Sequence, residues 1–186
     1  CGAVSGLVGT KLLGPRQNRV DRQCNISSIF GLFLLWWGWL GFNCGSTLGI
    51  TNQKWLYASK AGVTTILASI GGGISGIIYS HYKYCKYSVN LIINGILSGL
   101  VSITSCCIYV KTSESLFIGF ISSLIANIFN EYLKIFDIDD PLGVFSVHGI
   151  GAICGIISSG LFTKNINELN VHNGLFYNGG FYLLGI

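Results

Sequence analysis

The segment 144-VFSVHGIGAICGIISSGLF-162 decides the fold, because it contains no Asp, Glu, Lys or Arg and is long enough to cross a bilayer. A helix needs ~20 such residues to span a hydrocarbon core of ~30 Å. His148 is the exception in this run, and an ionisable side chain at that depth usually marks a path for an ion or a proton. The alternative is a neutral imidazole in the protein core that donates to a nearby carbonyl.

The composition of the whole chain is that of a membrane protein. Of the 186 residues, 51% are hydrophobic and only 10% are charged, whereas soluble domains carry ~25% charged residues. The 26 glycines lie inside runs of Leu, Ile, Val and Phe, where small side chains let helices approach closely. We therefore predict an all-α, polytopic integral membrane protein in a lipid bilayer.

Other classes of function lack their sequence signals. The net charge of +4 is spread over the loops, so it does not indicate nucleic-acid binding. The seven cysteines show no C-x-x-C spacing, and no P-loop or nucleophile motif is present. The sequence thus predicts no metal, no cofactor and no enzymatic activity. Without a nucleotide site, any transport would be passive or ion-coupled.

Six apolar windows predict a bundle of about five full spans plus one truncated span. They cover residues 1–13 (the truncated one), 26–42, 61–79, 89–110, 116–136 and 144–162. Ser102, Thr104 and Ser105 near the end of the fourth window predict a broken helix end there. Because residue 1 is a cysteine in a chain without methionine, and residues 181–184 look like the approach to another helix, we expect an internal fragment of a longer protein.

Basic residues predict the orientation of the spans, because cytoplasmic loops carry an excess of Lys and Arg. One set of alternate loops holds Lys11, Arg16, Arg19, Arg22, Lys83, Lys86 and Lys134. The other set holds Lys54, Lys60, Lys111 and Lys164. The first set is therefore predicted to be cytoplasmic, so the sequon at Asn25 would stay unglycosylated.

A stripe of four residues in the second window is a candidate cation site. Leu35, Trp39, Phe42 and Ser46 have i, i+4, i+7, i+11 spacing and share one helix face. Aromatic faces attract a desolvated cation, and a serine hydroxyl can accept a hydrogen bond from it. The alternative is ordinary helix packing together with an interfacial belt of aromatic residues.

A second stripe with the same spacing contains the histidine. Val144, His148, Gly151 and Gly155 are predicted to share a face of the last helix, where the glycines leave room for the imidazole to line a narrow lumen. The segment Asp139-Asp140-Pro141 just before this helix is typical of a capped N-terminus, and a catalytic use of the two acids is the alternative. These acids are also expected to face the basic loops.

Taken together, the motifs resemble the ammonium transporter family (Amt/Mep, with the Rh relatives). The matching stretches are Gly6-Leu7-Val8-Gly9, Leu13-Gly14-Pro15-Arg16, Gly38-Trp39-Leu40-Gly41-Phe42-Asn43-Cys44-Gly45-Ser46, Asn94-Gly95 with Gly99-Leu100-Val101, Asp139-Asp140-Pro141 with Val147-His148-Gly149, and Gly174-Leu175-Phe176-Tyr177-Asn178-Gly179-Gly180. They occur in family order, and two of them favour the Amt type over Rh. The resemblance implies that residues 1–186 are a partial ammonium transporter domain without its N-terminal half and last helix.

This resemblance implies an eleven-helix fold of two inverted halves, assembled as a homotrimer in the plasma membrane with one pore per subunit. Ammonium would be recruited at an outer aromatic site, lose its proton and cross a hydrophobic lumen as ammonia, in many members together with the proton. Six residues match positions of this pore: His148 (the second of two paired histidines), Phe42 (a gate phenyl ring), Ser46 (the hydroxyl of the outer site), and the pore-wall residues Leu35, Trp39 and Val144.

The chain also departs from the family pattern. The partner histidine would fall two positions before Cys1, Gly143 stands where a carboxylate is usual, and Ser105 stands where proline is usual. The resemblance leaves open an ammonium sensor, which would have the same fold and signal to a partner. A membrane enzyme using His148 would need a second catalytic motif that the sequence lacks.

Overall fold

The computed structural model describes residues 1–16, 26–140, 142–166, 169 and 171–185, and within these ranges all regular structure is helical. The elements are α1 (Gly2–Leu13), α2 (Ile26–Gly45), α3 (Lys54–Tyr84), α4 (Val89–Ile103), α5 (Thr112–Ile135), the π-helical turn η1 (Phe145–Ile150), α6 (Gly151–Phe162), and the 3₁₀ turns η2 (Leu175–Tyr177) and η3 (Tyr182–Leu184). The predicted all-α architecture is confirmed. Residues 17–25, which include Arg19, Arg22 and the sequon at Asn25, lie outside the described residues, as does Pro141.

Four helical segments are long and apolar enough to cross a membrane: α2, α3, α5 and residues 145–162. This supports the predicted polytopic bundle, but α4 is shorter than expected. Its 15 residues rise about 22 Å, which is less than a hydrocarbon core. The rest of the predicted window, residues 104–110, forms turns, as the cluster of hydroxyls there predicted.

The packed core consists of α3, α4 and α5, which contact one another extensively. Glycines allow this approach. A Cβ atom at Gly72 of α3 would overlap the carbonyl oxygen of Gly95 in α4, and one at Gly119 of α5 would overlap the carbonyl of Ala68. The Ser123 hydroxyl donates to the Gly72 carbonyl at 2.9 Å, so a buried polar contact fixes the same crossing.

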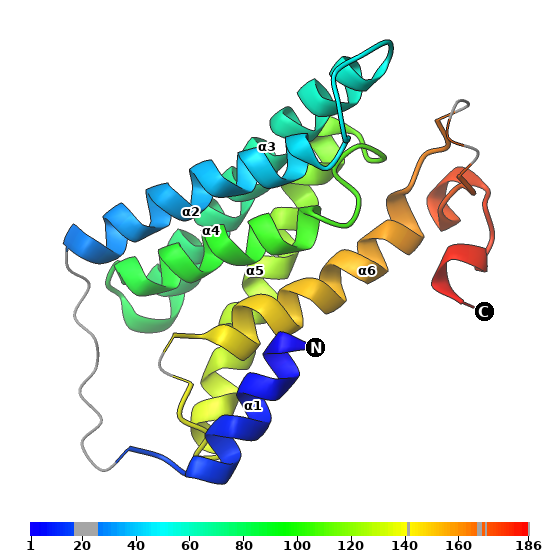
Figure 1. Cartoon of the computed structure of the whole chain (residues 1–186). Coiled ribbons are helices and arrows are strands. Elements are labelled where there is room, and N and C mark those ends of the chain that lie inside the picture. The colour runs from blue at the N-terminus through cyan, green and yellow to red at the C-terminus, as the bar shows by residue number, and fades with distance from the viewer. Residues whose placement is uncertain (17–25, 141, 167–168, 170, 186) are drawn as a thin grey trace.

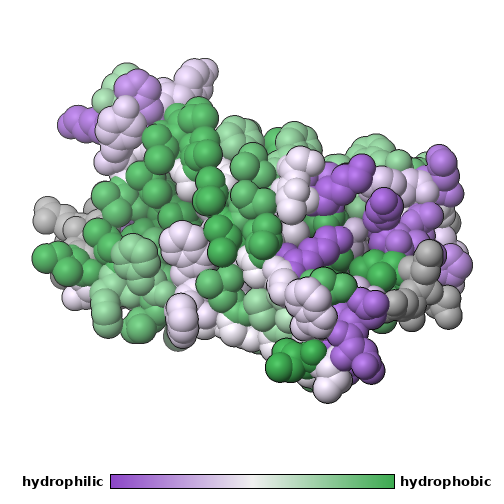
Figure 2. Space-filling view, turned by 90° about the horizontal axis from the view of Figure 1, so that it is seen from above, coloured by the Kyte–Doolittle hydropathy of each residue, from purple (hydrophilic) through white to green (hydrophobic). Residues whose placement is uncertain are grey.

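The remaining helices surround this core. Figure 1 shows α2 running beside α3 and α4, and α1 lying next to the start of the last helical segment. The turns η2 and η3 fold back against α6. Figure 2 shows hydrophobic side chains over the left and the middle of this face, with hydrophilic ones gathered on the right and on one projection at the upper left. A hydrophobic surface of this breadth is typical of a bundle that lies in a bilayer.

The last span is not a uniform α-helix, and this corrects the predicted stripe on it. Residues Phe145–Ile150 form a π-helical turn, whose i→i+5 bonding changes the register between His148 and the glycines. Gly151 and Gly155 are buried against α4, where an added Cβ would meet Val101 and Ser102. His148 is exposed. The prediction that His148 shares a face with both glycines is therefore wrong.

Candidate functional site

Two of the predicted site residues meet across 109 positions of sequence. The rings of Trp39 on α2 and His148 on η1 are stacked, with centroids 6.2 Å apart and planes inclined by 15°. Nearness in sequence does not produce this contact, because α3, α4 and α5 lie between the two residues along the chain. The centre of the candidate site is thus an indole lying parallel to an imidazole.

Residues 1–186 do not bury His148 in a packed core. The residue is exposed within this chain. No carbonyl among the described residues accepts a hydrogen bond from its ring. Within the described residues, no hydrogen bond supports the interpretation of His148 as a core imidazole that donates to a carbonyl, and that interpretation stays a prediction. The π-helical turn explains its position, since such turns often occur at functional sites and displace a side chain from the regular helical face.

Trp39 is held by a residue for which sequence reasoning found no role beyond a helix break. Its indole Nε1 donates to the Thr104 hydroxyl at 2.8 Å, and that hydroxyl donates to the Leu100 carbonyl at 2.8 Å. Thr104 lies directly after the last residue of α4. The only sequence signal was a threonine among polar residues inside an apolar window, which does not identify a partner 65 positions away.

Phe42 and Ser46 lie together at the other end of the α2 face. The Phe42 side chain is 62% exposed, and Ser46 is exposed one residue beyond the helix. The Ser46 hydroxyl donates to the Phe42 carbonyl at 2.6 Å. Because the hydroxyl proton is committed to that carbonyl, the lone pairs of the oxygen remain available to a cation. Asn43, between them, is buried and donates to Thr65 at 2.8 Å, which anchors α2 on α3.

Leu35 marks the opposite end of the α2 face, and Val144 lies apart from that helix, directly before η1. Leu35 is half exposed and lines a groove of about 1250 Å³, which also contains Arg16, Lys86, Lys134 and Asp139. Val144 is partly buried beside α1, where it approaches Gly6. From Leu35 through Trp39 to Ser46, the face rises about 16 Å along the helix. Leu35, Trp39, Phe42 and Ser46 thus connect the groove, the stacked rings and the exposed hydroxyl.

The acids before η1 act as predicted. Both carboxylate oxygens of Asp140 accept backbone N–H groups, from Val144 and from Phe145, each at 2.8 Å. Asp139 accepts from the Arg16 side chain at 2.6 and 3.1 Å, and hydrogen bonding to this carboxylate raises the pKa of Arg16 above its ordinary value. The helix cap and the expected contact between these acids and a basic loop are both confirmed.

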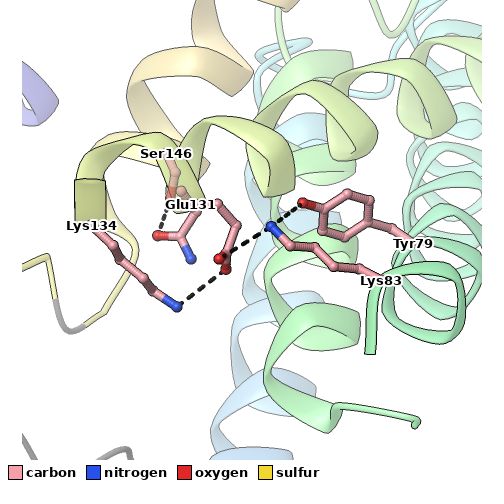
Figure 3. A network of polar contacts seen from close by, with 6 residues as sticks. Tyr79, Lys83, Glu131, Lys134 and Ser146 are labelled. Carbon is pink, nitrogen blue, oxygen red and sulfur yellow. Dashed lines mark hydrogen bonds and ion pairs between the residues drawn. The ribbon is translucent and has the colours of Figure 1, made fainter. Parts of the chain in front are cut away.

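A second charged cluster lies beside the groove, where α3 and α5 end. Figure 3 shows Lys83 and Lys134 on either side of the Glu131 carboxylate, at 3.3 and 3.2 Å, with the Tyr79 hydroxyl 3.4 Å from Lys83. Ser146 of η1 donates to the neighbouring Asn130 at 3.3 Å. Arg16, Lys83 and Lys134 come from the three loops that the charge count grouped as cytoplasmic, and they gather at one end of the bundle. Loops on one side of a membrane must lie at one end in this way.

This fold and this face define a multi-pass membrane protein with an aromatic and hydroxyl path along one helix. The model of the Ammonium Transporter Family matches residues 1–186. The chain is 40% identical over its whole length to putative ammonium transporter 3 of Caenorhabditis elegans, and 32% identical over 98% of its length to ammonium transporter Amt2 of Archaeoglobus fulgidus. The chain belongs to the ammonium transporter family.

Solved structures give the same answer. The chain matches Mep2 of Candida albicans with a TM-score of 0.84 and 27% identity, over 98% of this chain and 42% of that one. It matches a structure described as a sensor Amt protein with a TM-score of 0.79 and 26% identity, over 98% of this chain and 47% of that one. The matched region is 28% of the C. elegans relative and 42% of the A. fulgidus relative, so the chain spans less than half the length of these proteins.

Proposed function

We propose that residues 1–186 are part of a longer ammonium transporter, which recruits NH₄⁺ at an outer aromatic and serine site and conducts NH₃, with or without H⁺, through a hydrophobic pore. The observation that carries the proposal is the stacking of Trp39 on His148. This contact brings together two residues that the family resemblance had matched, each by its own motif, to one pore. The family membership and the names of the relatives supply the substrate.

The proposed outer site consists of Ser46 and Phe42. Removing water from NH₄⁺ costs free energy that must be offset by a hydrogen-bond acceptor and by aromatic faces. The Ser46 oxygen has free lone pairs, and the exposed Phe42 ring lies one turn away on the same face. This pair can bind the cation at the end of α2 and release it toward Trp39.

The proposed pore continues along Trp39, His148, Leu35 and Val144. Apart from the imidazole and the indole N–H, these side chains are apolar, so the path disfavours a charged species and favours neutral ammonia. An imidazole can either donate to or accept from NH₃, which gives a polar contact without a fixed charge. The path then opens into the groove of charged and polar residues beside Leu35.

The further properties of the proposal concern the whole protein. It would be a homotrimer in the plasma membrane, with one pore in each subunit and a second histidine supplied by the preceding part of the sequence. A sensor of ammonium is the second candidate, because one of the similar solved structures is described as a sensor Amt protein. A sensor would use the same binding residues and respond to ammonium without a matching flux.

The test is ammonium uptake by the full-length protein in yeast cells that lack their own ammonium uptake. Growth on low ammonium, together with an ammonium-dependent current in voltage-clamped oocytes, is the expected result for a transporter. Saturable ammonium binding to the purified protein without uptake would favour the sensor. Absence of both binding and uptake would refute the proposed function.

A further inference from the structure

The hydrogen bond between Trp39 and Thr104 has a fixed direction. An indole N–H can only donate, whereas a hydroxyl has one proton and two acceptor positions. The Thr104 proton goes to the Leu100 carbonyl at 2.8 Å, so the oxygen accepts from Trp39 at 2.8 Å. The β-branched side chain restricts rotation about χ1, which holds this oxygen in place. The indole plane is thus set by a hydroxyl that has a single compatible orientation.

The segment that presents Thr104 is itself attached to the helix after His148. Ser105 donates to the Gly155 carbonyl of α6 at 2.8 Å, and Ser159 donates to the Ser105 hydroxyl at 2.9 Å. The broken end of α4 therefore bonds α2 through Thr104 and α6 through Ser105. Since α6 directly continues η1, these two contacts fix the helices that carry Trp39 and His148 relative to each other.

A neighbouring tryptophan shows that the contact is specific to Trp39. Trp36, three positions earlier on α2, also has a buried indole nitrogen, but that nitrogen has no hydrogen-bond partner among the described residues. The Trp36 ring stacks on Phe33 of its own helix, at 6.3 Å between centroids. Helix packing alone therefore does not supply a partner for each indole on α2. The partner of Trp39 comes from the break after α4.

We infer that Thr104 is a positioning residue of the pore, which holds the Trp39 indole parallel to the His148 imidazole. This role rests on the proposed function, in which both rings line the path of ammonia. Thr104 itself does not need to touch the substrate. Its removal should slow passage through the pore, while recruitment at Ser46 and Phe42, near the end of α2, should not change.

The experiment is a double-mutant cycle in the full-length protein. Thr104→Val removes the hydroxyl at nearly constant shape, and Trp39→Phe removes the indole N–H while keeping an aromatic ring. Thr104→Val should lower the maximal ammonium transport rate about fivefold, the factor expected for one ordinary hydrogen bond. The ammonium concentration that gives half-maximal rate should stay unchanged. In the Trp39→Phe background, Thr104→Val should have no further effect.

Three variants serve as controls. Thr104→Ser retains the hydroxyl and should restore most of the rate. Trp36→Phe removes an indole N–H that has no described partner and should transport at the wild-type rate. Thr163→Val removes a hydroxyl that also donates to a helix carbonyl, at 2.6 Å from Ser159 O, but accepts from no described side chain. It should retain the wild-type rate.

A spectroscopic measurement separates this inference from the proposed function. The ultraviolet resonance Raman difference between wild type and Trp39→Phe reports the hydrogen bonding of the Trp39 N–H, and Thr104→Val should shift that signal to that of a free N–H. If the wild-type protein transports no ammonium, the proposed function fails. If the Raman signal of the Trp39 N–H does not shift in Thr104→Val, the inference fails as well. An equal rate loss from Thr104→Val in the Trp39→Phe background would overturn it as well. The same holds if Thr104→Val fails to accumulate in the membrane while Trp39→Phe accumulates normally.

Discussion

Of the four described segments long and apolar enough to cross a membrane, α3 and α2 differ most in how much of them the chain buries. In the most apolar window of α3, 56% of the residues are buried, against 11% in α2. Helix α3 packs closely on α4 and α5 through glycines. Helix α2 instead presents large apolar side chains such as Leu35 and Phe42 on its surface. Within residues 1–186, the candidate site thus lies on helices that the rest of the chain buries little, and the helices that pack tightly on one another serve as its support.

The largest effect is expected in the packed core, at Gly72. A methyl group there would overlap the Gly95 carbonyl, which belongs to the backbone and cannot move aside without displacing α4. Gly72→Ala should therefore lower the stability of the protein by several kcal/mol, at or above the upper end of the ~1–3 kcal/mol typical of overpacking. The measurement is the thermal unfolding midpoint of the detergent-purified full-length protein, together with its amount in the membrane.

The adjacent glycine is the matched control for this prediction. A Cβ at Gly73 would lie 3.2 Å from a side-chain carbon of Ile96, which can rotate away. Gly73→Ala should therefore unfold near the wild-type temperature. Equal tolerance of alanine at both positions would mean that α3 and α4 are not in backbone contact, and the distinction between a closed core and an open site would lose its basis.

The next effect is functional and belongs to the sparsely packed side. His148→Ala should abolish proton-coupled or electrogenic ammonium transport, because it removes the polar group next to Trp39 on an otherwise apolar path. The unfolding midpoint should change little, since an exposed ring leaves no buried cavity when it is removed. Currents and uptake, measured beside the thermal unfolding of the same variant, test both parts.

Two further histidine variants sharpen this result. His81, which stacks on Tyr87 at 5.3 Å at the end of α3, is the matched control, and His81→Ala should transport normally. His148→Asp keeps a group that exchanges protons and adds a negative charge, so it should admit cations, K⁺ included. A His148→Ala variant with normal current and normal ammonium preference would remove this residue from the pore. A variant that fails to fold would instead indicate a packing role.

Local patterns predicted the parts of the structure that depend on local physics. Apolar length located the spans, and the pair Asp139 and Asp140 predicted both the helix cap and a contact with a basic loop. The register of the last span was not predictable in the same way. A π-helical turn adds a residue to one turn without a composition of its own, so the spacing of His148 and Gly151 gave the wrong face.

The site was predictable in part. The stripe Leu35, Trp39, Phe42 and Ser46 follows from helical spacing, and the resemblance singled out His148. The bond from Trp39 to Thr104 depends on where α4 ends relative to α2, which no local signal specifies. Contacts between distant segments that involve a single hydroxyl are the part of a membrane fold that sequence patterns report least.

A moderate effect is expected at Ser46, which tests recruitment separately from passage. Ser46→Ala removes an acceptor for the bound cation, and a hydrogen bond to a charge contributes ~1.5–3 kcal/mol. The half-saturating ammonium concentration should rise about tenfold or more, with a smaller change in maximal rate. Ser59 is the control, because its hydroxyl also donates to a helix carbonyl, at 2.8 Å from Trp55 O, but lies outside the site. An unchanged concentration dependence in Ser46→Ala would exclude Ser46 from the site.

The smallest effect is expected at the junction between the two regions, where the segment after α5 leads into η1. Asp140→Ala removes a carboxylate that accepts the N–H groups of Val144 and Phe145, and loss of such a cap costs about 1 kcal/mol. Asp139→Ala removes the ion pair with the exposed Arg16 and a hydrogen bond from the Arg16 backbone N–H, and the ion-pair part of its effect should shrink as salt is added. In high salt it should therefore cost less than Asp140→Ala. The Asp140→Ala effect should persist in salt, because it comes from hydrogen bonds to the backbone. Asp140→Asn should recover part of the stability, since asparagine has one acceptor oxygen and can accept only one of the two N–H groups. Thermal unfolding of the three variants at low and high salt decides the matter. If Asp139→Ala is the more damaging substitution in high salt, then the start of η1, and with it the position of His148, depends on the contact with the loop at Arg16 and not on its own cap.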